Sequence, residues 1–144
     1  MIFNGATNDF KADCHCVGCY IVNNGRILLL KKLDSHELYP GKWGVVAGKK
    51  RVGESIFKAM EREVLEETCL SIKNSPYRHI STYRVVHPGL KFFYHVFLLE
   101  LLGKEPPVLI SPEHQAHMWS LPCQATSYDL IEDEANLINY HFNR

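Results

Sequence analysis

The chain has 144 residues, 46% of them hydrophobic, and its 16 basic and 16 acidic side chains give a formal net charge of zero. This length and this hydrophobic content fit one domain, spanning residues 1–144, around a single packed core. The even charge argues against a dominant nucleic-acid or membrane-surface partner, because such partners are attracted by an excess of basic side chains.

The N-terminal segment and the cysteines indicate the cellular compartment of the protein. Residues 1–11 lack a basic stretch followed by an apolar run, and no run in the sequence is long enough to cross a membrane. The five cysteines are an odd number in a domain of ordinary size, which is typical of reduced thiols rather than of a disulfide framework. We therefore expect a cytoplasmic protein, and a homodimer is left open.

The part of the chain before Gly48 is expected to form strands. Asn23-Asn24-Gly25 is a tight-turn sequence between two runs of apolar residues, which predicts a hairpin. A loop-like stretch containing Tyr39-Pro40-Gly41 follows, and a further short strand leads into Gly48. The expected strands span residues 17–22, 26–30 and 43–47, and the loop spans residues 32–42.

A group of thiols lies in and before the first of these strands. Cys14, Cys16 and Cys19 surround His15, and thiolates at close spacing bind zinc. Structural zinc sites normally draw paired ligands from two separated segments, whereas Cys19 falls inside a predicted strand, where a small buried cysteine packs well. We favour buried cysteines over a zinc site.

A dense group of carboxylates follows Gly48. Glu54 comes six positions after this glycine, and the run Arg62-Glu63-Val64-Leu65-Glu66-Glu67 lies beyond it. If residues 54–67 are helical, Glu63 lies one turn from both Glu66 and Glu67, so the three carboxylates project from nearly the same face. Because like charges at this spacing repel, we expect Mg²⁺ or Mn²⁺ between them rather than a plain solvated face.

The remainder of the chain is expected to add two long strands, a short strand and a helix. His87-Pro88-Gly89-Leu90 is typical of a hairpin turn, and Pro106-Pro107 lies in a linker over residues 103–112. The expected strands span residues 77–86, 91–102 and 118–121, and the helix spans residues 133–142. This order predicts an α/β protein in which a mixed sheet carries helices on two faces.

Residues 48–70 resemble the signature of the Nudix hydrolases, which ends in Arg-Glu-aliphatic-any-Glu-Glu-any-Gly-aliphatic. Every charged position of that signature is present, but Cys69 stands at the final glycine, and Val46 stands where the family commonly has a proline. Glycine after a helix usually serves a left-handed position that a residue with Cβ enters at a cost of about 1 kcal/mol. We therefore expect Cys69 to alter stability or loop geometry rather than the chemistry.

The resemblance implies a fold, an activity and a set of metal ligands. The fold is the Nudix fold, an α/β/α sandwich around a mixed β-sheet. The activity is hydrolysis of a phosphoanhydride bond in a nucleoside diphosphate linked to another group, X, with Mg²⁺ or Mn²⁺ as cofactor. Glu63, Glu66 and Glu67 would hold the metal, and a water bound to it would attack phosphorus, with Glu63 and Glu67 among the catalytic residues.

Further residues of the motif have orienting or binding roles by the same resemblance. Arg62 would fix the loop through Glu54, although a plain helical ion pair with Glu66 is the alternative. Gly48 and Lys49 are the candidate substrate-binding residues, with Lys49 either contacting a phosphate or solvated.

A late segment resembles the one from which Nudix enzymes often draw a further carboxylate. Glu113 precedes the Trp-containing strand and is a candidate general base or late metal ligand, but Ala116 stands where another acidic residue is common. His114 and His117 could also ligate a metal, although histidines in loops are usually only polar.

Two other functions and the identity of the substrate stay open. Isopentenyl diphosphate isomerase shares the Nudix fold and could provide an alternative reaction, and some Nudix-like domains bind nucleotides without cleaving them. The intact acidic motif favours hydrolysis of a small nucleotide or other diphosphate. Recognition of the base or of X would come from aromatic and imidazole side chains, for which the candidates are Tyr39, Tyr83, His87 and Tyr94.

Overall fold

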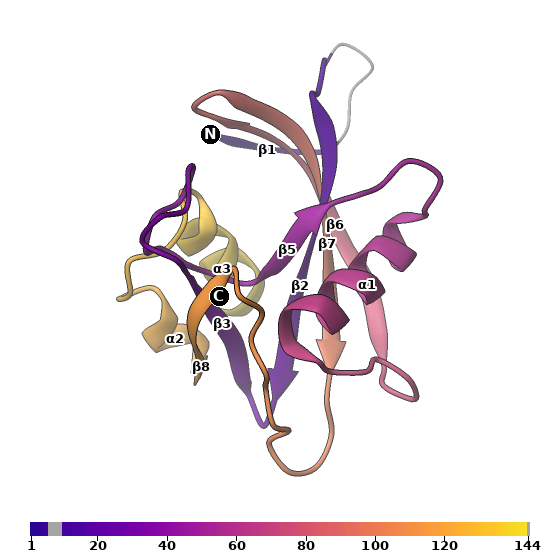
Figure 1. Cartoon of the computed structure of the whole chain (residues 1–144), viewed down its shortest axis with the longest axis vertical. Coiled ribbons are helices and arrows are strands. Elements are labelled where there is room, and N and C mark those ends of the chain that lie inside the picture. Colours follow the sequence, from indigo (N-terminus) through magenta and orange to yellow (C-terminus); the bar gives the residue numbers. More distant parts are fainter. Residues whose placement is uncertain (6–9, 144) are drawn as a thin grey trace.

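The computed structural model describes residues 1–5 and 10–143. Figure 1 shows a sheet with one long helix on one face and two shorter helices on the other. The strands are β1 (Ile2–Asn4), β2 (Cys14–Asn23), β3 (Arg26–Lys32), β4 (Trp43–Gly44), β5 (Val46–Lys49), β6 (Tyr77–His87), β7 (Leu90–Glu100) and β8 (His114–Ser120). The helices are α1 (Ile56–Thr68), α2 (Pro122–Ala125) and α3 (Glu134–Phe142).

Strand β2 is the centre of the mixed sheet. It pairs in parallel with β7 from Cys14 to Val22 and antiparallel with β3 and β5. The order of the main path is β1-β6-β7-β2-β3-β4, with β8 paired to β3. Because β5 pairs with β2 through the register Val17↔Gly48, the turn that precedes α1 starts from the middle of the sheet.

The two faces of the sheet bury two separate clusters of side chains. Val17, Cys19 and Ile21 of β2 pack in one core cluster with residues of α1, including Met60 and Val64. The alternate residues of β2 face the other way, because successive side chains of a strand point to opposite sides. These include Cys16 and Tyr20, which share the second cluster with Leu137 and Ile138 of α3. The predicted α/β architecture is confirmed.

Most predicted elements are present, with differences at their ends. The strand expected over residues 43–47 is divided at Val45 into β4, which pairs with β3, and β5, which pairs with β2. The strand expected at 118–121 begins earlier, at His114, because it pairs with β3 as far as Lys32. Neither β1 nor α2 was predicted. β1 has only three residues, and its strand conformation depends on pairing with β6 far along the chain.

Cys14, Cys16 and Cys19 do not gather at one point. Cys14 and Cys16 lie on one face of β2 with their Sγ atoms 3.9 Å apart, whereas Cys19 is buried in the cluster under α1. This placement agrees with the favoured prediction of buried cysteines. None of the helices in the described part of the chain is long and apolar enough to span a membrane.

Both ends of α1 have well-defined caps. The Ser55 side chain accepts a hydrogen bond from the Lys58 amide at 3.1 Å, which satisfies one of the free donors at the start of the helix. At the other end Cys69 has φ 59° and ψ 18°, a left-handed conformation, and its amide donates to the Leu65 carbonyl at 2.9 Å. Cys69 therefore takes the backbone conformation that the glycine of the signature would take.

Restoring that glycine is expected to stabilise the protein. Because glycine enters the left-handed region without the Cβ penalty, Cys69→Gly should raise the free energy of unfolding by about 1 kcal/mol. The Cys69 thiol is exposed, so little packing is lost. Chemical denaturation of the two proteins checks this result, and a variant that unfolds at lower denaturant would show that the thiol contributes more than the backbone strain costs.

Candidate functional site

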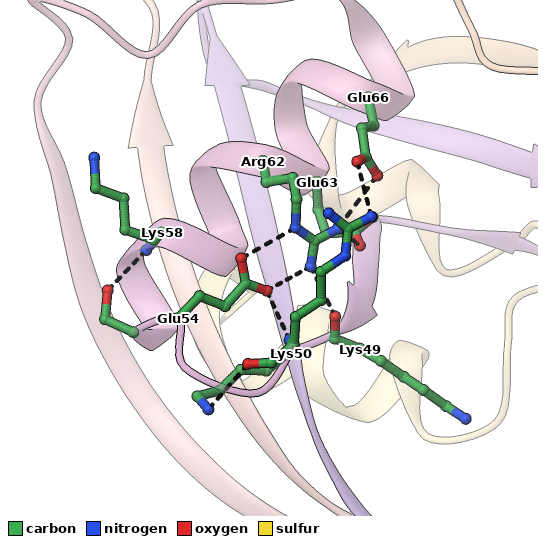
Figure 2. A network of polar contacts seen from close by, with 9 residues as sticks. Lys49, Lys50, Glu54, Lys58, Arg62, Glu63 and Glu66 are labelled. Carbon is green, nitrogen blue, oxygen red and sulfur yellow. Dashed lines mark hydrogen bonds and ion pairs between the residues drawn. The ribbon is translucent and has the colours of Figure 1, made fainter.

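Arg62 fastens the loop after β5 to helix α1. Its guanidinium donates from Nη2 to Glu54 Oε1 at 2.6 Å and to the Lys49 carbonyl at 2.9 Å. Nε donates to the other oxygen of Glu54 at 3.2 Å, and the Arg51 amide donates to Glu54 Oε1 at 2.7 Å. Figure 2 shows Glu54 and Arg62 facing each other across the loop. The Arg62 side chain holds the pKa of Glu54 down at about 2, with help from the Arg51 amide.

The same guanidinium also contacts the acidic face of the helix. Nη1 of Arg62 donates to Glu63 Oε1 at 2.7 Å and to Glu66 Oε2 at 3.3 Å. Arg51 approaches the other oxygen of Glu66 at 3.5 Å. Arg62 therefore makes the helical ion pair with Glu66 and also the loop-fixing bonds to Glu54. A bound cation would share Glu63 and Glu66 with it.

Gly48 leaves the space in which the Glu63 carboxyl lies. A Cβ added at Gly48 would collide with all three atoms of that carboxyl group, closer than real Cβ atoms come to other atoms. The carboxyl is thereby held against the backbone of β5 at the point where the strand leads into the loop. A residue with a Cβ at this position would push the Glu63 carboxyl aside.

Glu67 is the most deeply buried of the three glutamates, with 2% of its surface exposed. The Ala47 amide donates to its Oε1 at 3.4 Å. Burial, followed by the adjacent Glu63 carboxyl, raises the pKa of Glu67 well above its ordinary value. A divalent cation bound beside Glu67 would stabilise the ionised form of its carboxyl group.

His114 lies beside Glu67, a position that the sequence did not indicate. Its Nε2 is 3.9 Å from Glu67 Oε1, beyond hydrogen-bond distance, and has no hydrogen-bond partner among the described residues. Burial, with Lys32 as a further cause, lowers the pKa of His114 to about 4. The imidazole is therefore neutral at neutral pH and supplies no charge to balance Glu67.

The donors of this site suit a hard divalent cation. Glu63, Glu66 and Glu67 offer carboxylate oxygens from one face of α1, and oxygen is the donor that Mg²⁺ and Mn²⁺ prefer. Glu67 accepts only the long bond from the Ala47 amide, and the neighbouring His114 Nε2 has no hydrogen-bond partner among the described residues. The residues present therefore fit a divalent ion.

Glu113 and His117 lie outside this cluster. The Glu113 amide donates to Ser111 Oγ at 3.3 Å, its carbonyl accepts from the Leu33 amide at 3.3 Å, and its side chain is exposed. The carboxylate acts on His36 through its charge. His117 is exposed on β8. The structure thus unites the motif glutamates with Arg62 and does not bring Glu113 into hydrogen-bond contact with them.

A cavity of about 230 Å³ lies on the α3 side of the sheet. Part of its wall is β5, through Ala47, Gly48 and Lys49, so the cavity borders the turn that carries the glutamate helix. The Lys49 side chain extends away from the glutamates in Figure 2. Three of the candidate recognition residues, Tyr39, His87 and Tyr94, line this cavity. The fourth, Tyr83, lines a separate, smaller space.

Comparison with known proteins gives one family. The model of the NUDIX domain matches residues 15–140. The nucleoside triphosphatase NudI of Escherichia coli is 29% identical over 117 residues, which are 76% of this chain and 83% of NudI.

Solved structures share the fold. The MutT protein from Methanosarcina mazei Go1 has a TM-score of 0.76 and 23% identity, covering 91% of this chain and 93% of that chain. A bifunctional NMN adenylyltransferase/ADP ribose pyrophosphatase from Francisella tularensis, complexed with AMP and a manganese ion, has a TM-score of 0.71 and 19% identity. That match covers 92% of this chain and 42% of the Francisella chain.

Proposed function

Because the chain belongs to the NUDIX domain family, we propose that it hydrolyses a phosphoanhydride bond in a nucleoside diphosphate linked to another group, X, with Mg²⁺ or Mn²⁺ as cofactor. The observation that carries this proposal is the packing of the Glu63 carboxyl against Gly48, next to the buried Glu67. Gly48, against which the Glu63 carboxyl packs, also contributes to the wall of the cavity.

Each residue of the cluster has a separate task in this proposal. Glu63, Glu66 and Glu67 would hold the cation, which supplies neutralisation of phosphate charge and activation of water. Arg62 positions the loop through Glu54 and the Lys49 carbonyl, and it orients Glu63. The Lys49 ammonium is exposed where β5 borders the cavity and would contact a phosphate of the substrate.

The relatives support a nucleotide substrate. NudI is named a nucleoside triphosphatase, and the Francisella enzyme was crystallised with AMP and manganese. The full set of motif glutamates favours cleavage over binding alone, because a module that only binds nucleotides has no need of three carboxylates beside a buried histidine.

The experiment that tests this function is a hydrolysis screen of the purified chain with Mg²⁺. The panel contains ADP-ribose, nucleotide sugars, dinucleoside polyphosphates, nucleoside triphosphates and capped RNA, and the products are separated by chromatography. We expect a nucleoside monophosphate or a related phosphorylated fragment from at least one substrate. Binding of these compounds without any cleavage would instead identify a non-catalytic module.

Adding a methyl group at Gly48 is expected to reduce activity more than stability. In Gly48→Ala the new Cβ must displace the Glu63 carboxyl, which is the far end of a flexible side chain and can move away. We expect the free energy of unfolding to change by about 1 kcal/mol or less and kcat to fall about tenfold or more.

A double-mutant cycle shows whether Gly48 acts through Glu63. In a Glu63→Gln background, Gly48→Ala should cost little further activity, because the group that it displaces is already disabled. Losses that simply multiply in the double variant would mean that Gly48 acts independently of Glu63.

A further inference from the structure

Resting on the proposed function, we propose that His114 is a further ligand of the divalent ion and binds it through Nε2. The ligands named above are all carboxylates of α1, whereas His114 is the first residue of β8. With His114 the ligand set contains nitrogen as well as oxygen. The ion that this set favours is a first-row transition-metal ion such as Mn²⁺ or Co²⁺ rather than Mg²⁺.

His114 has a buried nitrogen without a partner. Its side chain has no exposed surface, and Nε2 makes no hydrogen bond within residues 1–5 and 10–143. Buried polar atoms in folded proteins are nearly always hydrogen-bonded, because an atom that loses water without a replacement costs stability. The orphaned nitrogen therefore points to a ligand beside it.

The distance from this nitrogen to Glu67 suits a shared ion. Nε2 is 3.9 Å from Glu67 Oε1, which is too far for a hydrogen bond. Bonds from a divalent ion to nitrogen and oxygen are about 2.0 to 2.2 Å long, so one ion can contact two atoms that lie about 4 Å apart. The two atoms can therefore bind the same ion at their present separation.

Ser111 holds the imidazole by its other nitrogen. Ser111 Oγ lies 3.3 Å from His114 Nδ1, and the Ser111 carbonyl accepts from the His114 amide at 3.1 Å. Histidines that bind a metal commonly donate their second ring N–H to an oxygen, which leaves the lone pair of the first nitrogen for the ion. The role of His114 as a ligand requires this tautomer, with the proton on Nδ1 and Ser111 Oγ accepting it.

Lys32 and His36 are the basic neighbours of His114. Both act on it through their charge, and Lys32 also acts on Glu67. Both line the cavity on the α3 side of the sheet, whose wall contains neither Glu67 nor His114. Neither makes a hydrogen bond or an ion pair with Glu67 or with His114 Nε2 in the part of the chain that the structure describes. The place between these two groups is thus left to a cation from solution.

A nitrogen ligand changes which ion the site prefers. Mg²⁺ favours oxygen ligands in a nearly ideal octahedron and gives up its water reluctantly. Imidazole suits the later first-row ions, and the affinity of nitrogen and oxygen sites rises from Mn²⁺ to Co²⁺. With His114 among its ligands the site should discriminate against Mg²⁺ more strongly than the glutamates do alone.

Pulsed electron paramagnetic resonance of the Mn²⁺ complex tests the contact directly. The full chain is loaded with one equivalent of Mn²⁺ in the absence of substrate, so the result does not depend on turnover. We expect the coupling of a directly bound nitrogen nucleus in the wild type and its loss in His114→Gln, because glutamine would present an oxygen to the ion. A wild-type spectrum without this coupling would overturn the proposal, whether or not the variant folds.

The variant is needed because other histidines also offer nitrogen. His87, Glu132 and Asp133 have the spacing of metal ligands, and His15 Nδ1 lies 3.0 Å from His95 Nε2. An ion held at either of these places would keep its nitrogen coupling in the variant. A coupling that survives the substitution would therefore refute the assignment.

Calorimetric titration with Co²⁺ and with Mg²⁺ separates a ligand from a structural residue. The binding event of interest is the one that Glu67→Gln weakens. In His114→Gln the affinity for Co²⁺ should fall about tenfold, while the affinity for Mg²⁺ stays within about threefold. A residue that only supports the loop would lower both affinities together, and this result would count against the proposal. Circular dichroism checks that the variant folds.

The matched control is His117→Gln on the same strand. His117 is exposed and lies outside the glutamate cluster, so both affinities should stay unchanged. If the control lowers the affinity for Co²⁺ as much as His114→Gln does, the effect does not come from the buried nitrogen. Nitrogen coupling without any product in the hydrolysis screen would refute the proposed reaction and leave the ligand, whereas product without nitrogen coupling would do the reverse.

Discussion

Glu67→Gln is expected to lower kcat by about 10² or more while the protein stays folded. Glutamine has the shape of glutamate without its charge, so the change removes a candidate metal ligand and little packing. Because burial already raises the pKa of Glu67, the neutral amide should be accepted at this position without loss of stability. Steady-state kinetics at saturating Mg²⁺ and thermal unfolding measure the two effects.

The matched control for this variant is Glu61→Gln on the same helix. Glu61 pairs with Lys58 at 3.2 Å on the exposed surface and is not part of the glutamate cluster. An exposed pair of this kind contributes about 0.5 kcal/mol or less, so kcat should stay within about twofold. If Glu67→Gln lowers kcat by less than about tenfold, Glu67 does not hold the catalytic ion.

Glu113→Gln is expected to lower kcat by about 10² to 10⁴ with little change in substrate affinity, the range for loss of a general base. We propose this role although Glu113 does not contact the motif glutamates in the described structure, because catalytic groups often come into place only with substrate bound. Its side chain is exposed in the turn before β8, next to His114.

The pH profile of kcat separates this role from a structural one. If Glu113 is the general base, the variant should no longer show the fall of kcat at low pH that protonation of the base causes. If Glu113 only stabilises its loop, the variant should have a changed KM and the same pH profile of kcat. An unchanged kcat across the profile would exclude Glu113 and leave Glu63 or Glu67 as the residue that activates water.

The glutamate helix could be predicted from the sequence because its signals are local. Helical spacing puts Glu63, Glu66 and Glu67 on one face whatever the rest of the chain does. The structure has this helix one or two residues from the expected ends, with the Glu54–Arg62 pair beside it. The preference for glycine after a helix is also a local rule, but it left open whether Cys69 takes the left-handed conformation or bends the loop differently, and the structure has the left-handed conformation.

His114 could not be placed from the sequence, because its position depends on an irregularity of pairing. Lys31 pairs with Ala116 and Lys32 with His114, so Gln115 is an extra residue in β8. Such a bulge reverses the alternation of faces along the strand. A simple alternating pattern therefore assigns His114 to the wrong side and hides its approach to Glu67.

The cavity could not be predicted from the sequence for a related reason. Its walls come from β5, β7 and α3, which are far apart along the chain and meet only through the sheet order. Tyr39, His87 and Tyr94 were candidates from their chemistry alone, and the structure brings these three to one space.

The measurement that tests the central claim most directly is turnover in excess chelator, followed by return of Mg²⁺ or Mn²⁺. In the proposed reaction, a cation held by Glu63, Glu66 and Glu67 neutralises the negative charge of the substrate, because Arg62 and Lys49 alone do not balance it. We therefore predict that hydrolysis of the best substrate in the screen falls by about 10² or more in chelator and returns with either metal. Full turnover in excess chelator would contradict the account.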